Sequence, residues 1–224
     1  MVASSQIFPL MTDKQTVQVP DAVVFDLGKV LVDFDYSIAG RRIAERSTRT
    51  AQEVQDMIDH APLLFRYETG LINREEFFAE IQKATGFAGT LTEFSEFFAD
   101  IFTPIPEMVA LHARLRAQGI ATFIFSNTND LAVSHIRANF PFFSQFDGYV
   151  LSYEEGAMKP APKIYEAVER LTGRRGVQLV YLDDRPENAQ AGAARGWQVI
   201  QHHTPSVSIA ALQELGLPVA VYPL

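Results

Sequence analysis

The stretch VFDLGKVLVDFD at residues 24–35 ends an apolar run on an aspartate, turns at a glycine, and becomes apolar again before two further aspartates. The run that it closes, AVVFDL at residues 22–27, is nearly continuous in aliphatic and aromatic residues, which is typical of a strand covered on both faces. A lone acid at a strand end is more often a helix cap or part of a surface turn than a functional group. The importance of Asp26 therefore depends on what the rest of the chain brings to it.

The chain repeats this pattern, because further aliphatic runs end in small or polar residues and are followed by amphipathic helical patterns. The other predicted strands are 121–127, 148–152, 179–184 and 197–201, and the predicted helices are 106–118, 129–138, 161–172 and 186–195. Glycines stand where three of these helices would stop, at Gly119, Gly173 and Gly196. This alternation predicts an α/β fold with a doubly wound parallel sheet.

Residues 36–103 interrupt the alternation, since they contain helix signatures but no convincing strand. Capping-box spacing, a Thr or Asn followed by Glu three residues later, occurs at the pairs Thr50/Glu53, Asn73/Glu76 and Thr90/Glu93. We therefore expect an N-terminal extension at residues 1–20, an α/β core at 21–35 and 104–224, and an inserted helical subdomain at 36–103.

Composition limits the function classes. The chain has 224 residues, of which 47% are hydrophobic, and its formal net charge is −8. Such a charge disfavours a nucleic-acid partner or an anionic membrane surface, and no apolar run is long enough to span a bilayer. The absence of cysteine excludes disulfides and a thiol nucleophile, and the first residues lack a secretory pattern, so we expect a cytoplasmic protein. Monomer and homodimer both remain open.

The ends of the predicted strands carry polar residues that would meet at one edge of the sheet. In parallel α/β sheets ligands bind at the carboxyl ends of the strands, where the chain order switches direction. The residues at these ends, or in the loops that follow, are Asp26, Ser126, Asn127, Lys159, Asp183 and Asp184. Two or three acids, a hydroxyl and an amine together indicate a functional site far more strongly than one acid does.

The chemistry of this set fits phosphoryl transfer. A carboxylate can attack phosphorus and form an aspartyl-phosphate, which divides one hard displacement into two easier ones. Mg²⁺ prefers oxygen ligands, and Asp26 and Asp184 with one backbone carbonyl could hold it. Lys159 and Ser126 would then hold the remaining phosphate oxygens.

The segments FDLGKVLVD, IFSNTN, GAMKPAPKIY and LDDRPEN, in this order and spacing, resemble the four motifs of the haloacid dehalogenase (HAD) superfamily. The resemblance runs from about residue 21 to residue 202, and the helical insert matches the cap of that superfamily. Within it, the motifs most resemble bacterial sugar-phosphate phosphatases of the glucose-1-phosphate type and the phosphatase domain of soluble epoxide hydrolases.

The resemblance implies a role for each matching position. Asp26 would be the nucleophile, Ser126 the phosphate-binding hydroxyl and Lys159 the phosphate clamp. Asp184 and the main-chain carbonyl of Gly28 would join Asp26 as Mg²⁺ ligands. Asp183 would lie behind the ion and orient a bound water or Lys159, and Asn188 would hydrogen-bond Asp26 or Asp184 or cap its own helix.

The chain departs from the family pattern at Gly28, where most phosphatases of the superfamily carry the aspartate that protonates the leaving group and later activates water. Substrates with good leaving groups would lose least: acyl phosphates, anhydrides and, to a lesser degree, sugar 1-phosphates. Lys29 either contacts substrate or is a solvated turn lysine. In the segment LLFRYETG at 63–70, Arg66 lies between Phe65 and Tyr67, where a lid could touch a sugar or a phosphate, or where the side chains could only pack.

We therefore expect a Mg²⁺-dependent phosphatase that acts on a small phosphorylated metabolite, with a sugar phosphate as the leading substrate class. A metal-independent 2-haloacid dehalogenase is one alternative, although the paired acids Asp183 and Asp184 favour a cation. A protein that binds phosphometabolites or a partner without turnover is the other, because Gly28 lacks the acid and a fold alone does not establish function.

Overall fold

A computed structural model describes residues 18–59 and 62–219, so most of the expected extension at 1–20 lies outside the described residues. Its central sheet has five parallel strands in the order β5-β4-β1-β6-β7. These strands are β1 (Ala22–Phe25), β4 (Ala121–Ser126), β5 (Gly148–Leu151), β6 (Leu179–Asp183) and β7 (Gln198–Gln201). The first strand lies in the middle of the sheet, and the order changes direction on its two sides, which confirms the predicted doubly wound topology.

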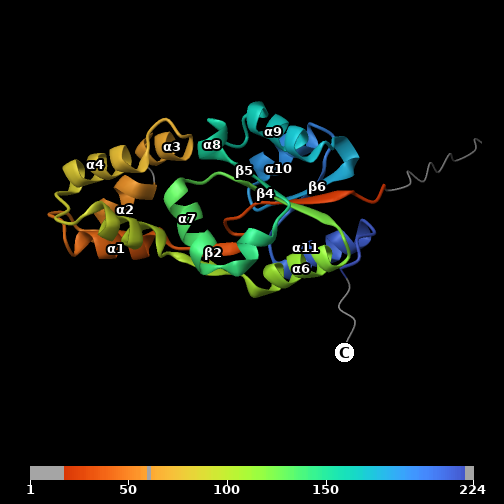
Figure 1. The fold of residues 1–224 in the computed structure, drawn as a ribbon, viewed down its shortest axis with the longest axis horizontal. Helices are drawn as coiled ribbons and strands as arrows, with labels where there is room; N and C mark the ends of the chain where they lie inside the picture. Colours follow the sequence, from red (N-terminus) through yellow and green to blue (C-terminus); the bar gives the residue numbers. More distant parts are fainter. Residues whose placement is uncertain (1–17, 60–61, 220–224) are drawn as a thin grey trace, which may run out of the picture.

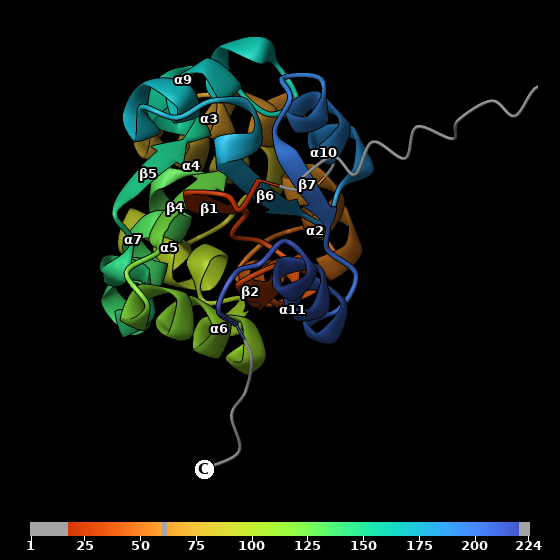
Figure 2. The same cartoon turned by 90° about the vertical axis from the view of Figure 1, so that its right-hand side faces the viewer.

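Helices cover both faces of the sheet (Figures 1 and 2). Helices α6 (Pro106–Ala117), α7 (Asp130–Asn139) and α11 (Pro205–Glu214) pack on one face, and α9 (Pro162–Thr172) and α10 (Pro186–Ala193) lie on the other. Alternate side chains of β1 pack on opposite faces of the sheet: Val23 and Phe25 belong to one buried cluster, and Ala22 and Val24 to the other. Burial on both faces explains why this strand is almost purely apolar in sequence.

Between residues 36 and 99 the chain forms five helices with a hydrophobic cluster of their own. They are α1 (Tyr36–Ala44), α2 (Ala51–Asp59), α3 (Pro62–Glu68), α4 (Arg74–Thr85) and α5 (Leu91–Ala99), and Figure 1 shows them beside the sheet. We call this helical segment the cap. The predicted hydrogen bonds at its helix starts are present, since Asn73 and Thr90 form complete capping boxes and Thr50 exchanges hydrogen bonds with Glu53.

The expectation that residues 36–103 contain no strand is wrong at their end. Strand β3 (Phe102–Pro104) pairs antiparallel with β2 (Val32–Phe34), so a short two-stranded ribbon joins the cap to the core. Phe34 and Phe102 lie opposite each other in this ribbon. Each strand has three residues, which is too short for a period-two pattern to be recognised in the sequence.

The remaining elements are the short helix α8 (Ser152–Glu155), which begins at the last residue of the strand predicted at 148–152, and two 3₁₀ turns, η1 (Pro141–Gln145) and η2 (Gly176–Gln178). Among the residues that the structure describes, no helix is both long enough and apolar enough to cross a membrane.

Candidate active site

Asp26 directly follows β1, and the residue is 7% exposed. The backbone N–H of Leu27 donates a 2.7 Å hydrogen bond to one of its oxygens, and the Lys159 Nζ lies 2.9 Å away. Burial raises the pKa of Asp26 more than the charge of Lys159 lowers it. The carboxylate is therefore held in one orientation at a place where negative charge is costly and a cation would stabilise it.

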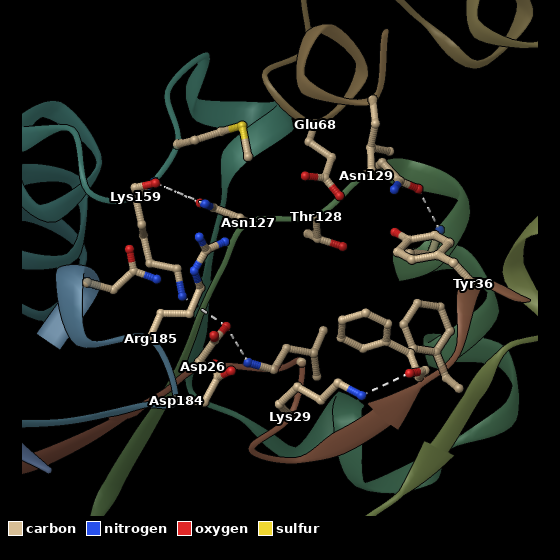
Figure 3. A pocket seen from close by; sticks show the side chains of 18 residues that line it. Asp26, Lys29, Tyr36, Glu68, Asn127, Thr128, Asn129, Lys159, Asp184 and Arg185 are labelled. Atoms are coloured by element: carbon tan, nitrogen blue, oxygen red, sulfur yellow. Dashed lines mark hydrogen bonds and ion pairs between the residues drawn. The ribbon is translucent and has the colours of Figure 1, made fainter. Parts of the chain in front are cut away.

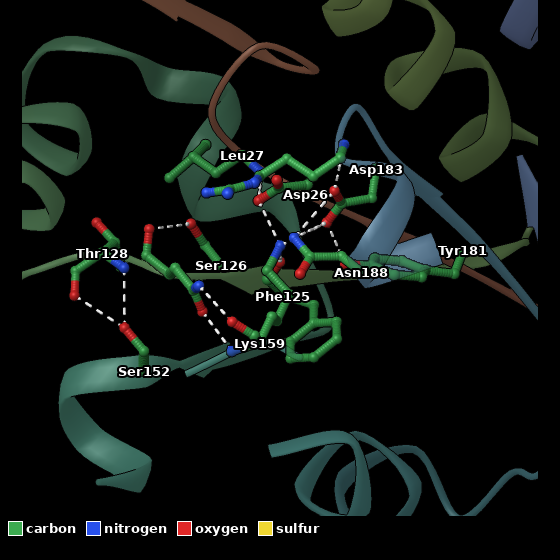
Figure 4. Close-up of polar contacts among 12 residues, drawn as sticks. Asp26, Leu27, Phe125, Ser126, Thr128, Ser152, Lys159, Tyr181, Asp183 and Asn188 are labelled. Carbon is green, nitrogen blue, oxygen red and sulfur yellow. Dashed lines mark hydrogen bonds and ion pairs between the residues drawn. The ribbon is translucent and has the colours of Figure 1, made fainter. Parts of the chain in front are cut away.

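Lys159 is almost completely buried between two carboxylates (Figure 4). Its Nζ lies 2.7 Å from Asp183 and donates a 3.0 Å hydrogen bond to the Phe125 carbonyl, in addition to the contact with Asp26. The Phe125 and Tyr181 rings lie on either side, with centroids 5.0 and 5.7 Å from Nζ. Burial opposes its charge, but the two carboxylates outweigh burial and raise the pKa of Lys159. The ammonium group is thus charged and fixed.

Asp183 and Asp184 are neighbours with different surroundings. Asp183 is fully buried and accepts hydrogen bonds from four groups: Lys159 Nζ, the Tyr181 hydroxyl, the Arg185 backbone N–H and the Asn188 amide. Burial opposes its ionised form, but Lys159 and these hydrogen bonds lower the pKa of Asp183. Asp184 is half-buried and lines the cavity, and burial together with the charge of Asp183 raises its pKa.

These contacts test whether a divalent cation fits. Carboxylate oxygens of Asp26, Asp183 and Asp184 all lie within 4.8 Å of one another. The hydrogen bonds around Asp183 already satisfy it, whereas the ionised forms of Asp26 and Asp184 lack compensating positive charge, since burial raises the pKa of both. An oxygen-ligated dication fits this donor set, with Asp26 and Asp184 as the available carboxylates. Asn188 donates to Asp183 at 3.1 Å, so the expectation that it bonds Asp26 or Asp184 is wrong.

A cavity of about 270 Å³ opens above these groups (Figure 3). Asp26, Gly28, Lys29, Asn127, Lys159, Asp184 and Asn188 line it, and with them the sequence-predicted strand ends do come together. The lining also includes residues that carry no functional signal of their own in the sequence: Leu27, Phe34, Tyr36, Leu64, Glu68, Phe102, Thr128, Asn129, Ala132, Met158 and Arg185. The cap and the connecting ribbon therefore form the part of the cavity that faces the strand ends.

Two predicted contact residues form hydrogen bonds at the end of β4. Ser126 is 2% exposed at the end of β4, and its hydroxyl donates to the Asn127 carbonyl at 3.3 Å. Asn127 holds the loop of Lys159 on both sides, because its amide donates to the Lys159 carbonyl at 3.0 Å and accepts from the Lys159 N–H at 2.7 Å. Asn127 thus fixes the backbone from which the buried ammonium reaches Asp26.

Arg66 does not face the cavity, so its assignment as a contact residue is wrong for this arrangement of the cap. It lines a different surface hollow together with Glu76, Glu80 and Lys83. Helical phase explains the error: Leu64 and Glu68, one turn apart on α3, face the cavity, and Arg66 lies midway between them on another side of the helix. Its neighbour Tyr67 is buried and donates a hydrogen bond to Asp130 of the core.

Lys29 is an exposed residue of the turn after Asp26, and it lines the rim of the cavity. It is the one non-glycine residue with positive φ (+59°) among those described. Its side chain forms an ion pair with Asp33, donates a 2.9 Å hydrogen bond to the Phe34 carbonyl, and lies 4.5 Å from the centre of the Phe34 ring. In the turn after Asp26, Lys29 and not Gly28 has the left-handed backbone conformation.

The Phe34 ring occupies the space beside Gly28. A Cβ atom at position 28 would lie 2.8 Å from Cε1 of this ring, closer than ordinary van der Waals contact. Phe34 in turn packs against Tyr36 and Phe102, with ring centroids 5.6 and 6.0 Å apart. A side chain at position 28, where the family resemblance implies an acid, would thus meet an aromatic edge.

With this geometry established, sequence profiles of known families identify the chain. The profile of the haloacid dehalogenase-like hydrolases matches residues 20–196. The chain belongs to this family of hydrolases.

Two curated relatives match most of the chain. It is 27% identical over 208 residues to acyl-CoA dehydrogenase family member 10 of Mus musculus; the match covers 88% of this chain but only 19% of that protein. It is 24% identical over 187 residues to D-ribitol-5-phosphate phosphatase of Bacteroides thetaiotaomicron, covering 80% of this chain and 90% of the relative.

Solved structures agree on the fold. A HAD family enzyme of Bacteroides thetaiotaomicron superposes with a TM-score of 0.75 at 22% identity, covering 83% of this chain and 94% of that enzyme. The same enzyme was also solved in complex with magnesium and inorganic phosphate, and that structure matches with a TM-score of 0.74 at 22% identity, covering 82% and 94%. The predicted family and the predicted α/β fold with a parallel sheet are confirmed.

Proposed function

We propose that the protein is a Mg²⁺-dependent phosphatase that hydrolyses a small phosphorylated metabolite, with sugar and polyol phosphates as the preferred class. The observation that carries this proposal is the position of Lys159 Nζ, 2.9 Å from Asp26 at the base of a cavity that Asp184 also lines. A buried ammonium beside a buried carboxylate provides a nucleophile and a positive charge for the same phosphate group.

Each residue of the site has a role in this reaction. One oxygen of Asp26 attacks phosphorus, the bond from phosphorus to the leaving oxygen breaks, and an aspartyl-phosphate forms. Lys159 stabilises the charge on the phosphate oxygens, and Asn127 holds the loop that carries it. Ser126 would turn its hydroxyl toward a phosphate oxygen. Water then attacks phosphorus and releases Asp26.

Mg²⁺, held by Asp26, Asp184 and the Gly28 carbonyl, would supply electrostatic compensation for bringing a phosphate dianion next to a carboxylate. Asp183 keeps Lys159 in place from behind, at 2.7 Å. The contacts support this division of roles, because four protein donors hydrogen-bond Asp183 and none of these bonds goes to Asp184.

The preferred substrate class is supported by size and by a relative. A cavity of about 270 Å³ accommodates a phosphate with a small organic group. The relative from Bacteroides thetaiotaomicron that covers 80% of this chain is a D-ribitol-5-phosphate phosphatase. A polyol or sugar leaving group is therefore the first class to test.

The test is a phosphate-release screen over small phosphoesters, with Mg²⁺ or with EDTA, and a parallel assay for halide release from 2-chloropropionate. We expect phosphate release that requires Mg²⁺ and falls below a few per cent in Asp26→Asn, because the amide is neither a useful nucleophile nor an anionic ligand. Asp21→Asn, which removes the same charge from an exposed position before β1, is the matched control and keeps full activity. Halide release without metal would support the dehalogenase, and binding of phosphoesters without turnover would support a non-catalytic protein.

A further inference from the structure

The cavity wall away from Asp26 has two chemically different sides (Figure 3). One side is aromatic and consists of Phe34, Tyr36 and Phe102, whose rings pack against one another. The other side is polar, with the carboxylate of Glu68 and the hydroxyl of Thr128 directed toward the cavity. A ligand with an apolar C–H face and hydroxyl edges complements such a cavity, since a few placed polar groups on an apolar wall fix a ligand's orientation.

Contacts between the cap and the core fix the position of Glu68. The buried Ser152 hydroxyl donates to the Glu68 carbonyl at 2.5 Å and accepts from the Thr128 backbone N–H at 2.9 Å. One side chain of the core therefore holds the backbones of both polar lining residues. Two residues later, Gly70 packs so closely that an added Cβ would lie 2.2 Å from the Tyr153 carbonyl oxygen. The end of α3 is thus seated on the core, with Glu68 at a defined place over the cavity.

The outer cavity carries charges of both signs. The cations Lys29 and Arg185 lie at the rim, where they pair with Asp33 and Glu187, and the carboxylate of Glu68 lies on the polar side of the wall. Glu68 is half-buried, where solvent screens its charge less than at the surface. A leaving group that carries its own negative charge would meet this carboxylate unfavourably.

We propose that Glu68 selects the leaving group: its carboxylate accepts a hydrogen bond from a hydroxyl of the sugar or polyol and repels leaving groups that carry a second negative charge. This inference rests on the proposed phosphatase function and adds the residue that decides between substrates. Both effects are expected of one group, because specificity arises from attraction to the right ligand and from repulsion of the wrong one.

Three esters on the same three-carbon frame separate these effects: propyl phosphate has no hydroxyl, glycerol 1-phosphate has two, and 3-phosphoglycerate has one hydroxyl and a carboxylate in place of the other. The variant is Glu68→Gln, which keeps the size of the side chain and removes the charge. The matched control is Glu80→Gln, which makes the same change at an exposed cap position outside the cavity. All measurements use the full chain with Mg²⁺, and thermal melting verifies that each variant is folded.

In Glu68→Gln we expect kcat/KM for glycerol 1-phosphate to fall about 10-fold relative to propyl phosphate, the loss of one hydrogen bond to a charged group. We expect kcat/KM for 3-phosphoglycerate to rise about 10-fold relative to propyl phosphate, the ester that has neither a hydroxyl nor a second charge, because the repulsion is removed. Glu68→Asp keeps the charge but shortens the side chain by one methylene. It should lose the preference for the hydroxyl ester and retain part of the discrimination against the carboxylate ester. Glu80→Gln should change neither.

Equal changes for all three esters would overturn the inference, since Glu68 would then act on the phosphate or on the position of the cap. Unchanged preferences would overturn it as well, while the phosphatase function would stand. If the unmodified protein released phosphate from none of these esters or from p-nitrophenyl phosphate, both the proposed function and the selection by Glu68 would be refuted.

Discussion

The missing acid at Gly28 can be tested by rebuilding it, and the structure predicts that this requires two substitutions. A Cβ at position 28 would lie 2.8 Å from the Phe34 ring, whereas ordinary contacts begin at 3.4 Å, so the ring must move by about 0.6 Å. Tyr36 and Phe102 pack against that ring, and Lys29 lies over it. Such overpacking costs on the order of 1–3 kcal/mol. Gly28→Asp alone should therefore destabilise the protein and place its carboxylate poorly.

Phe34→Ala removes the obstructing ring, and the double variant Gly28→Asp/Phe34→Ala then has room for the acid. General acid catalysis is typically worth roughly 10²- to 10⁴-fold in rate. An acid introduced without supporting contacts should reach the lower end, about 10²-fold, which corresponds to about 2.7 kcal/mol of transition-state stabilisation. The gain should appear in esters with poor leaving groups, because a good leaving oxygen departs without a proton.

The assay compares kcat/KM for propyl phosphate with kcat/KM for p-nitrophenyl phosphate. In the unmodified protein we expect a large advantage for the nitrophenyl ester. In the Asp double variant this advantage should shrink about 10²-fold relative to Gly28→Asn/Phe34→Ala, which has the same shape and the same loss of aromatic packing but no acid.

Two results would refute this reasoning. If the unmodified protein already hydrolysed both esters at similar rates, another group would supply the proton, and the lack of an acid at Gly28 would not lower the rate. If the Asp and Asn double variants were indistinguishable, a carboxylate at position 28 would not reach the leaving oxygen, and the steric explanation based on Phe34 would be wrong.

Three further predictions concern metal binding, pH and the contact between cap and core. Calorimetric Mg²⁺ titration should show a larger loss of affinity for Asp184→Asn than for Asp183→Asn, whose effect should stay within about 10- to 100-fold because it acts through Lys159; the reverse ranking would exchange their roles. Burial lowers the pKa of His112 to about 4, so the free energy of unfolding should be unaffected by this group above pH 6.5 and should fall by about 3 kcal/mol as the pH drops from 6.5 to 4. Urea unfolding of His112→Gln should lack this loss, and identical pH curves for the two proteins would contradict the prediction. Asp130→Ala removes a hydrogen-bond acceptor of Tyr67 across the cap–core contact and should raise KM more than it lowers kcat, whereas an unchanged KM would show that this contact does not position the cap.

The parallel sheet could be predicted from sequence because each buried strand leaves a continuous apolar run, and each run ends near the residue where the strand ends. The order of the strands then decides which ends meet, and for a doubly wound sheet that order follows a small set of rules. The sequence therefore predicts that Asp26, Lys159, Asp183 and Asp184 lie together. Their distances could not be predicted, because Lys159 reaches Asp26 from a loop whose course depends on Asn127.

The leaving-group side of the cavity was less accessible to sequence reasoning. Glu68 and Arg66 are two residues apart in one polar and aromatic segment, and only the rotation of α3 against the core decides which of them faces the cavity. That rotation depends on long-range contacts, such as the hydrogen bond from Ser152 to the Glu68 carbonyl. Phe34 belongs to a three-residue strand whose partner is on the far side of the cap in sequence, so its closeness to Gly28 has no local signal.

The connecting ribbon links substrate binding to the orientation of the cap. Phe34 and Phe102 are opposite each other in the antiparallel pair through which the chain leaves and re-enters the core, and both also line the cavity. Any rotation of the cap about this ribbon would therefore change the aromatic wall against which a leaving group packs. A leaving group that fits between these rings and Glu68 would in turn favour the cap orientation that brings all three together, because a ligand shifts a conformational equilibrium by its difference in affinity for the two states. Phe34, which occupies the space beside Gly28, thus couples the orientation of the cap to the binding of the leaving group.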